Sequence, residues 1–234
     1  MSDTDPEQEP IEPIFLAEAD RREEEAVGVA SFLLSLRSRG IRDIRLLRAM
    51  ELVPRDVFAP RRFSDLSRTD VSLPLPCGQT MTAPRTVAAM LRALAVEEGH
   101  KVLEVGTGTG YVSALLARLG AQVHSVERYN TLAESAAQHL KIVQASGVHI
   151  EVGDGLAARP RERFDRILLN GAVEAVPAAV TSLLGPGGRL VGALTVEGPP
   201  RLVRIDRLDD GELRQETGAG LRISPLVTGV ARIL

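Results

Sequence analysis

The residues of this chain that could bind a ligand begin with three glycines at alternate positions. Gly106, Gly108 and Gly110 follow directly after an apolar run that is typical of a buried strand. Glycine permits turns with positive φ and lets backbone N–H groups approach a ligand closely. Glu127 follows the next apolar run along the chain, so we expect its carboxylate at the tip of a neighbouring strand. Glycines beside the middle of a nucleoside and an acid on its ribose hydroxyls would form a nucleoside site.

Two more acids stand near the ends of predicted strands. Glu104 lies within the first run, where it could accept a hydrogen bond from an ammonium group or polarise the glycine turn. Asp154 lies between Gly153 and Gly155 after a third apolar run, where it could contact an adenine amine. Either acid alone is also compatible with a strand-end charge or a common Asp-Gly turn. Acids at three successive strand tips favour one shared ligand, and we predict S-adenosylmethionine.

Other ligand classes fit the sequence less well. A dinucleotide fingerprint places its third glycine three positions after the second, but Tyr111 occupies that position here and would crowd a pyrophosphate. The sequence has no glycine-rich loop ending in Lys-Ser or Lys-Thr and no His-Glu-x-x-His motif. Its four histidines lack metal-ligand spacing, and the single cysteine, Cys77, excludes an intrachain disulfide and a cysteine cluster. We therefore expect no bound metal.

Strand-like and helix-like patterns alternate from residue 101 onward. Such alternation predicts an α/β fold with a mostly parallel, Rossmann-like sheet and helices on both faces. The turn Asp209-Asp210-Gly211 predicts an antiparallel C-terminal hairpin, and residues 221–233 could add a last strand. The predicted strands are 101–105, 121–126, 148–152, 165–169, 187–193, 201–206 and 212–216, and the predicted helices are 111–119, 130–145 and 176–184.

The N-terminal part of the chain differs in charge from the remainder. Residues 1–25 carry a net charge of −8, which leaves +5 for the rest of the protein. We expect a disordered acidic leader over residues 1–16, because acids and prolines there leave little to bury. Residues 17–234 are long enough to bury one core, so we expect a single domain.

Within that domain, the first part is predicted to be helical. An apolar face predicts a helix over residues 17–38, and Asp43 could cap the next helix. Residues 61–79 read as irregular, and Pro84 stands near the start of a further helix.

Composition excludes several partners. The net charge of −3 and an aromatic content of 3% argue against nucleic-acid binding. The acidic N-terminus is unlike a secretory signal, and no apolar stretch approaches the ~20 residues that would span a bilayer. We expect a cytoplasmic monomer that does not bind membranes.

Several blocks of the sequence, taken together, point to one family. Residues 78–84, Gly-Gln-Thr-Met-Thr-Ala-Pro, resemble an active-site block written Gly-Gln-Thr-Ile-Ser-x-Pro. The glycine turn, Ser125-Val126-Glu127-Arg128 and Gly153-Asp154-Gly155 resemble cofactor blocks of the same family. The chain resembles the protein-L-isoaspartate O-methyltransferase family from about residue 38 to the C-terminus. Further matching segments are residues 39–43, 49–58, 187–191 and 224–226.

The resemblance implies a class I S-adenosylmethionine-dependent methyltransferase that repairs damaged proteins. It would methylate the carboxylate of isoaspartyl residues in proteins and peptides, releasing S-adenosyl-L-homocysteine, and the ester would collapse to a succinimide that partly returns to aspartate. Residues 17–98 would form the helical and substrate-loop region. Thr82 stands at the family's active-site serine and is the implied catalytic residue. The implied donor-binding residues are Thr80, Met81, Glu104, Gly106, Thr107, Gly108, Gly110, Glu127, Arg128, Asp154 and Gly155. The implied acceptor-binding residues are Gln79, Thr80, Thr82, Asn170, Pro225 and Leu226.

The chemistry of this reaction agrees with the lack of an obvious catalytic His or Cys. A carboxylate is ionised at neutral pH and needs no strong base. Alignment of its oxygen with the donor methyl, about 3–3.5 Å away, can supply most of the catalysis. Departures from the family pattern at Thr82, Cys77, Asn170 and Ser224 bear on the acceptor. They leave two alternatives, a carboxyl methyltransferase of another peptide or small molecule and a non-catalytic S-adenosylmethionine-binding homologue.

Overall fold

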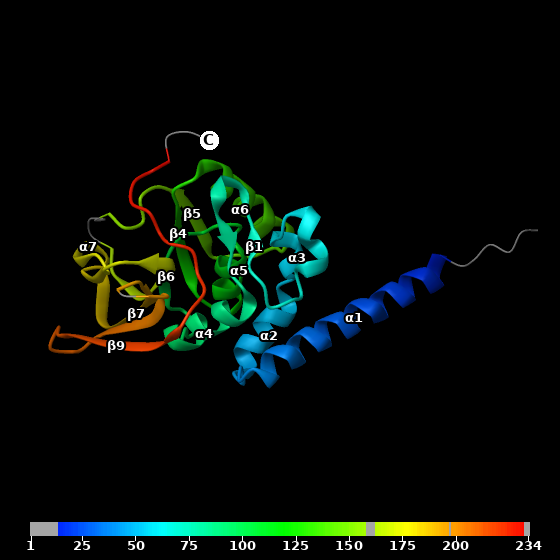
Figure 1. The fold of residues 1–234 in the computed structure, drawn as a ribbon, viewed down its shortest axis with the longest axis horizontal. Coiled ribbons are helices and arrows are strands. Elements are labelled where there is room, and N and C mark those ends of the chain that lie inside the picture. The colour runs from blue at the N-terminus through cyan, green and yellow to red at the C-terminus, as the bar shows by residue number, and fades with distance from the viewer. Residues whose placement is uncertain (1–13, 158–161, 197, 232–234) are drawn as a thin grey trace, which may run out of the picture.

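A computed structural model describes residues 14–157, 162–196 and 198–231. Its centre is a seven-stranded sheet with the order β5-β4-β3-β6-β7-β8-β9 (Figure 1). The strands from β3 to β7 pair in parallel, whereas β8 and β9 are antiparallel. The strands are β3 (Lys101–Val105), β4 (Gln122–Glu127), β5 (Val148–Val152), β6 (Phe164–Val173), β7 (Leu184–Leu194), β8 (Arg201–Arg207) and β9 (Leu213–Gly220). The predicted parallel sheet and C-terminal hairpin are confirmed.

Alternate residues of the buried strands enter two apolar cores on opposite faces of the sheet. In β3, Val102 belongs to the core beneath the main helices, whereas Leu103 belongs to the core of the other face. Two-sided burial of a parallel strand explains its nearly continuous apolar sequence. The main helices are α2 (Ile44–Leu52), α3 (Arg55–Phe58), α4 (Pro84–Leu94), α5 (Tyr111–Arg118) and α6 (Asn130–Ile142).

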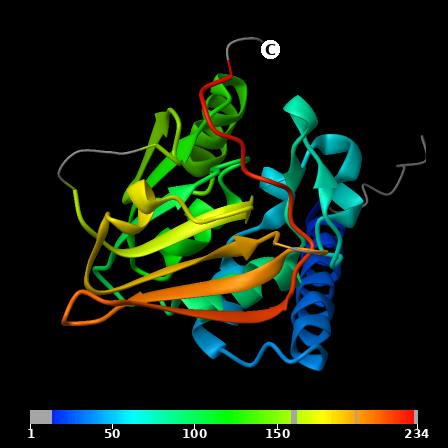
Figure 2. The ribbon, with the colours of Figure 1, turned by 60° about the vertical axis from the view of Figure 1, so that its left-hand side comes forward.

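The N-terminal helix α1 (Ile14–Ser38) is 25 residues long and extends away from the sheet (Figures 1 and 2). Its C-terminal half joins the core through Phe32 and Leu36. The helix begins three residues before the predicted start, within the segment expected to be a disordered leader. Residues 1–13 of that leader lie outside the described residues. No helix in the described residues is long and apolar enough to span a membrane.

Two predicted elements differ from the structure. The predicted helix 176–184 is the single turn α7 (Ala178–Thr181), because buried Leu184 pairs with Phe164 and begins β7 instead. The predicted last strand at 221–233 is wrong for its described part, which contains only an isolated bridge between Ala172 and Pro225. Pro225 lacks an N–H donor and therefore cannot pair as an inner-strand residue does.

The region expected to be irregular contains short ordered pieces. It holds the 3-10 helices η1 (Arg61–Leu66) and η2 (Pro76–Gly78) and the strand β1 (Leu73–Pro74), and the strand β2 (Thr80–Met81) follows it directly. β1 and β2 pair antiparallel as a small hairpin separate from the main sheet. This hairpin carries the Gly-Gln-Thr block to the carboxyl ends of the central strands (Figure 2).

Candidate active site

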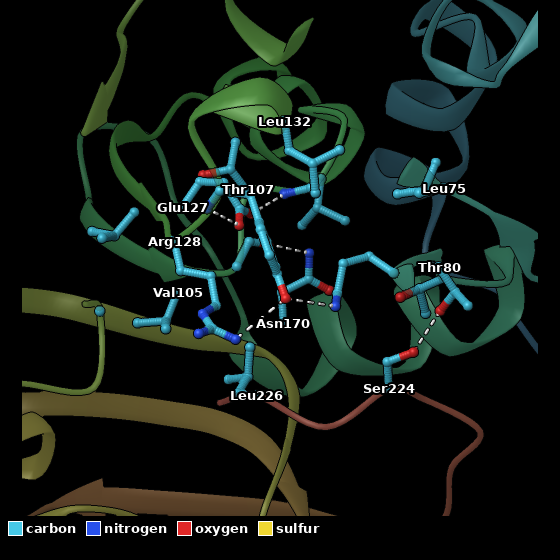
Figure 3. A pocket seen from close by; sticks show the side chains of 18 of the residues that line it. Leu75, Thr80, Val105, Thr107, Glu127, Arg128, Leu132, Asn170, Ser224 and Leu226 are labelled. Atoms are coloured by element: carbon cyan, nitrogen blue, oxygen red, sulfur yellow. Dashed lines mark hydrogen bonds between the residues drawn. The ribbon is translucent and has the colours of Figure 1, made fainter. Parts of the chain in front are cut away.

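A pocket lies at the carboxyl ends of the parallel strands, where ligands bind in open α/β sheets (Figure 3). Its walls come from the turn after β3, the ends of β4 and β5, β6, the β1–β2 hairpin and the C-terminal segment. The predicted site residues that line it are Gln79, Thr80, Met81, Thr82, Gly106, Thr107, Gly108, Glu127, Arg128, Asp154, Gly155, Asn170, Pro225 and Leu226. Glu104 and Gly110, both predicted to bind the donor, do not line the pocket.

The glycine turn after β3 has the left-handed backbone that its sequence predicts. Gly106, Gly108 and Gly110 have φ values of +94°, +56° and +89°. A Cβ at Gly106 would lie 3.1 Å from the Leu226 side chain, and one at Gly110 would lie 3.2 Å from Cβ of Ala136. Gly110 therefore permits close packing of the turn against α6, which is why it lies away from the pocket.

Glu127 places a buried carboxylate in the pocket wall. Its side chain is only 4% exposed in relative area and accepts hydrogen bonds from the backbone N–H groups of Gly108 (2.8 Å) and Tyr129 (3.1 Å). Burial raises the pKa of Glu127, and these backbone bonds and Arg128 oppose that rise. A carboxylate can accept about four hydrogen bonds, so Glu127 retains acceptor capacity for a ligand with hydroxyl groups.

Glu104 lies beneath the glycine turn instead of facing the pocket. It is fully buried and accepts hydrogen bonds from Ser113 of α5, from Ser125 of β4 (2.8 Å) and from Asn170 Nδ2 (3.3 Å). Burial raises the pKa of Glu104 to about 7, against the effect of these three donors. Its hydrogen bonds connect α5, β4 and β6 inside the fold, so the expected contact with a ligand ammonium group has no support here.

Asn170 connects this buried network to the pocket. Its side-chain amide donates to Glu104 and, at 3.0 Å, to the carbonyl oxygen of Gly106 (Figure 3). The side-chain amide thus fixes Gly106, the first residue of the glycine turn, and Asn170 also lines the cavity.

The C-terminal segment is held against the pocket wall by Asp154 and Arg128. Asp154 Oδ1 accepts from the N–H of Leu156 at 2.9 Å, and its Oδ2 accepts from the N–H of Gly229 at 2.7 Å. Arg128 Nε donates to the carbonyl of Gly229 at 3.0 Å, and the carbonyl of Arg128 accepts from the N–H of Ala231 at 3.1 Å. Two predicted donor-binding residues therefore hold this segment in place.

The same segment meets the β1–β2 hairpin on the other side of the pocket. Thr80 Oγ1 and Ser224 Oγ lie 2.6 Å apart and share a hydrogen bond (Figure 3). Gln79 Nε2 donates to the carbonyl of Cys77 at 3.2 Å and contacts the Tyr129 hydroxyl at 3.5 Å. Thr82 follows this hairpin, is 9% exposed and lines the cavity.

Sequence reasoning missed several residues that line the pocket. Tyr129 follows the strand-tip acid by two residues, and an aromatic side chain so close to Glu127 was the available signal. Ser224 lies in a segment that matches the family and is itself a departure from the pattern, but its contact with Thr80 joins residues 144 positions apart and has no local signal. The other lining residues outside the predicted set are Leu75, Val87, Val105, Thr109, Tyr111, Val112, Val126, Leu132, Gly153, Leu156, Ile223 and Val227. Of these, Val126 and Gly153 stand within the blocks that resemble the family's cofactor blocks. Among the described residues, no group of three or more His, Cys, Asp or Glu could hold a metal ion.

Comparison with known proteins identifies the family. The family model described as Protein-L-isoaspartate(D-aspartate) O-methyltransferase matches residues 29–231. The chain belongs to this family. It is 42% identical to a protein-L-isoaspartate O-methyltransferase of Azorhizobium caulinodans over 222 residues, which are 93% of this chain and 99% of that protein. It is 43% identical to protein-L-isoaspartate O-methyltransferase 2 of Rhodopseudomonas palustris over 87% of this chain and 94% of that protein.

A solved structure supports the fold of this isoaspartate methyltransferase family member independently. The Plasmodium falciparum protein described as a putative protein-L-isoaspartate O-methyltransferase, in complex with S-adenosyl-L-homocysteine, matches with a TM-score of 0.74 at 19% identity. The match covers 84% of this chain and 97% of that one. This match shows the fold, whereas the family model and the 42% identical relative confirm the family resemblance drawn from the Gly-Gln-Thr block and the cofactor blocks.

Proposed function

We propose that this family member transfers a methyl group from S-adenosylmethionine to the carboxylate of isoaspartyl residues in damaged proteins. The observation that carries the proposal is one pocket that contains two half-sites. We assign Glu127 and the glycine turn to its donor side, and Thr82 with the β1–β2 hairpin that precedes it to its acceptor side. Family membership over residues 29–231 supports the same reaction.

The residues of the donor side fit S-adenosylmethionine. Glu127 offers carboxylate oxygens to the ribose hydroxyls, and its negative charge favours a cationic ligand nearby. Gly108 leaves room beside the turn, because a Cβ there would have no heavy atom closer than 4.0 Å. Asp154 remains able to accept from an adenine amine, since a carboxylate has about four acceptor positions and two are used. When bound, the donor supplies an electrophilic methyl group on a sulfonium.

The acceptor side holds and orients a carboxylate. We assign to the Thr82 hydroxyl the donation of a hydrogen bond to one carboxylate oxygen, which directs the other toward the donor side. Gln79, Thr80 and Asn170 surround the same space with further amide and hydroxyl groups. The acceptor oxygen is already anionic at neutral pH, so no residue has to remove a proton from it. Alignment in a partly closed pocket is the main contribution that these residues make.

The direct test is methyl transfer from labelled S-adenosylmethionine to paired peptides. One peptide carries an isoaspartyl residue, and its control has the same sequence with a normal aspartyl residue. The proposal expects label on the isoaspartyl peptide and none above background on the control. Equal labelling of both peptides, or of neither, would reject the proposed acceptor. Labelling of one dominant small molecule in cell extract would instead favour another carboxylate acceptor.

A further inference from the structure

Arg55 is a buried cation behind the acceptor side of the pocket. It stands in the one-turn helix α3, directly after Pro54, and is only 4% exposed. Its guanidinium donates to the backbone carbonyls of Ser67 (2.9 Å), Val71 (3.0 Å) and Thr82 (3.2 Å). These carbonyls lie 12, 16 and 27 residues further along the chain, so one side chain gathers three separate points.

The segment that Arg55 holds has little regular structure of its own. Between Ala59 and Pro84 it contains only 3-10 turns and the two-residue strands β1 and β2. Few backbone bonds within this segment can therefore fix the position of Thr82. The bond from Arg55 to the carbonyl of Thr82 acts on the residue itself, and the bonds to Ser67 and Val71 fix the approach to the hairpin.

The environment of Arg55 shows that its charge is not used in an ordinary ion pair. No described carboxylate lies within 4.0 Å of its guanidinium nitrogens, and Nε has no hydrogen-bond partner in the described part of the chain. Burial lowers the pKa of Arg55, while the nearby Tyr111 and Asp70 act in the opposite direction. Burying a cation without a carboxylate partner carries a large desolvation penalty, and hydrogen bonds to carbonyl groups offset only part of it. The only hydrogen bonds that the structure gives this guanidinium within the described residues are its three carbonyl contacts.

We infer that Arg55 is a positioning residue for the methyl-transfer reaction, which holds the Thr82 backbone in the acceptor site through its three carbonyl contacts. The inference rests on the proposed function, since it assigns a role in orienting the acceptor. Arg55 does not line the pocket and acts through Thr82. It fixes the acceptor side without taking part in donor binding.

The test compares two substitutions of Arg55 with a matched control. Arg55→Met keeps most of the side-chain volume but removes all three hydrogen bonds, and Arg55→Lys keeps the charge and can reach one carbonyl. Arg189→Lys is the control, because Arg189 also donates to a backbone carbonyl, that of Ala93, but lies away from the pocket. Each variant is assayed below its unfolding temperature for kcat and KM with an isoaspartyl peptide and for calorimetric affinity for S-adenosyl-L-homocysteine. Amide hydrogen exchange of residues 71–83 is measured in parallel.

We expect Arg55→Met to lower kcat/KM for the peptide on the order of 100-fold, because small misplacements of an aligned group are costly. Arg55→Lys should recover part of that loss, and affinity for S-adenosyl-L-homocysteine should stay within about threefold of the original protein. Exchange should accelerate in residues 71–83 of both variants, whereas Arg189→Lys should change only thermal stability.

Three results would overturn the inference. The first is an unchanged kcat/KM in Arg55→Met. The second is a loss of affinity for S-adenosyl-L-homocysteine in that variant as large, in proportion, as its loss of kcat/KM. The third is an unchanged rate of amide hydrogen exchange in residues 71–83. If Arg55→Met does not fold, Arg55→Lys decides by the same readouts. If the unsubstituted protein fails to methylate the isoaspartyl peptide, the proposed function fails, and the exchange data then decide separately whether Arg55 holds the Thr82 segment.

Discussion

Glu127 Oε2 accepts a hydrogen bond from the backbone N–H of Gly108 at 2.8 Å, so the acid at the end of β4 directly holds the glycine turn that follows β3. The other oxygen of the same carboxylate accepts from the N–H of Tyr129. One side chain therefore fixes two parts of the pocket wall while it offers its remaining acceptor positions to the cavity.

Glu127→Gln should weaken donor binding strongly. The carboxamide has one acceptor oxygen in place of two, so its NH2 group would face a backbone N–H that it cannot satisfy. Loss of a charged hydrogen bond of this kind should raise the Kd for S-adenosyl-L-homocysteine about tenfold or more in isothermal calorimetry. The matched control is Glu134→Gln, an exposed acid on α6 that bonds only to Asn130 among the interactions described. Equal affinities in all three proteins would contradict the assigned role of Glu127.

Substitutions at Thr82 should separate turnover from donor affinity. Thr82→Val keeps the shape of the side chain and removes its hydroxyl, whereas Thr82→Ser keeps the hydroxyl. We expect kcat for an isoaspartyl peptide to fall about tenfold in Thr82→Val and to stay close to the original in Thr82→Ser, as for loss of one hydrogen bond. Affinity for S-adenosyl-L-homocysteine should not change in either variant. Full turnover by Thr82→Val would show that the hydroxyl has no such role.

Glu104 predicts a specific dependence of stability on pH. Its pKa in the folded protein is raised to about 7 from an ordinary value of 4.5. Between these two pH values, the folded state keeps a proton that the unfolded state has released. This group therefore contributes stability fully below pH 4.5 and loses that contribution as pH rises toward and through 7. Glu104→Gln cannot titrate, so its free energy of unfolding relative to the original protein should increase between pH 5 and about 8, as followed by denaturant titration. Parallel pH profiles for the two proteins would contradict the prediction.

The hydroxyl pair of Thr80 and Ser224 should affect the acceptor more than the fold. Both groups lie at the edge of the pocket, where the hairpin meets the C-terminal segment. In a double-mutant cycle with Thr80→Ala and Ser224→Ala, we expect a coupling energy of about 0.5–1.5 kcal/mol in kcat/KM for the peptide. Additive effects, with no coupling, would show that the pair does not act as a unit.

Much of the architecture could be predicted because it follows local rules. Alternating strands and helices predicted the parallel sheet, and the three strand-tip acids predicted which edge carries the pocket. The structure confirms the sheet and places Glu127 and Asp154 in one cavity. Glu104 could have been separated from them by strand periodicity. It shares a face with Val102, which enters the core beneath the helices, and therefore points under α5.

Other features depend on contacts that no local pattern reports. The pairing of Leu184 with Phe164 shortened a predicted helix to one turn, since tertiary burial decided between helix and strand. The bond between Thr80 and Ser224 and the three contacts of Arg55 join segments far apart in sequence. The sequence marks these residues as polar, but only the folded chain shows what they hold.

The fate of the isoaspartyl bond tests the central claim most directly. An isoaspartyl peptide is incubated with the protein and S-adenosylmethionine over several turnover times, and its aspartyl and isoaspartyl forms are separated by chromatography and counted. We predict that the isoaspartyl form declines and the normal aspartyl form accumulates, and that neither change occurs when the methyl donor is omitted. A constant isoaspartyl fraction in the complete reaction would contradict the account.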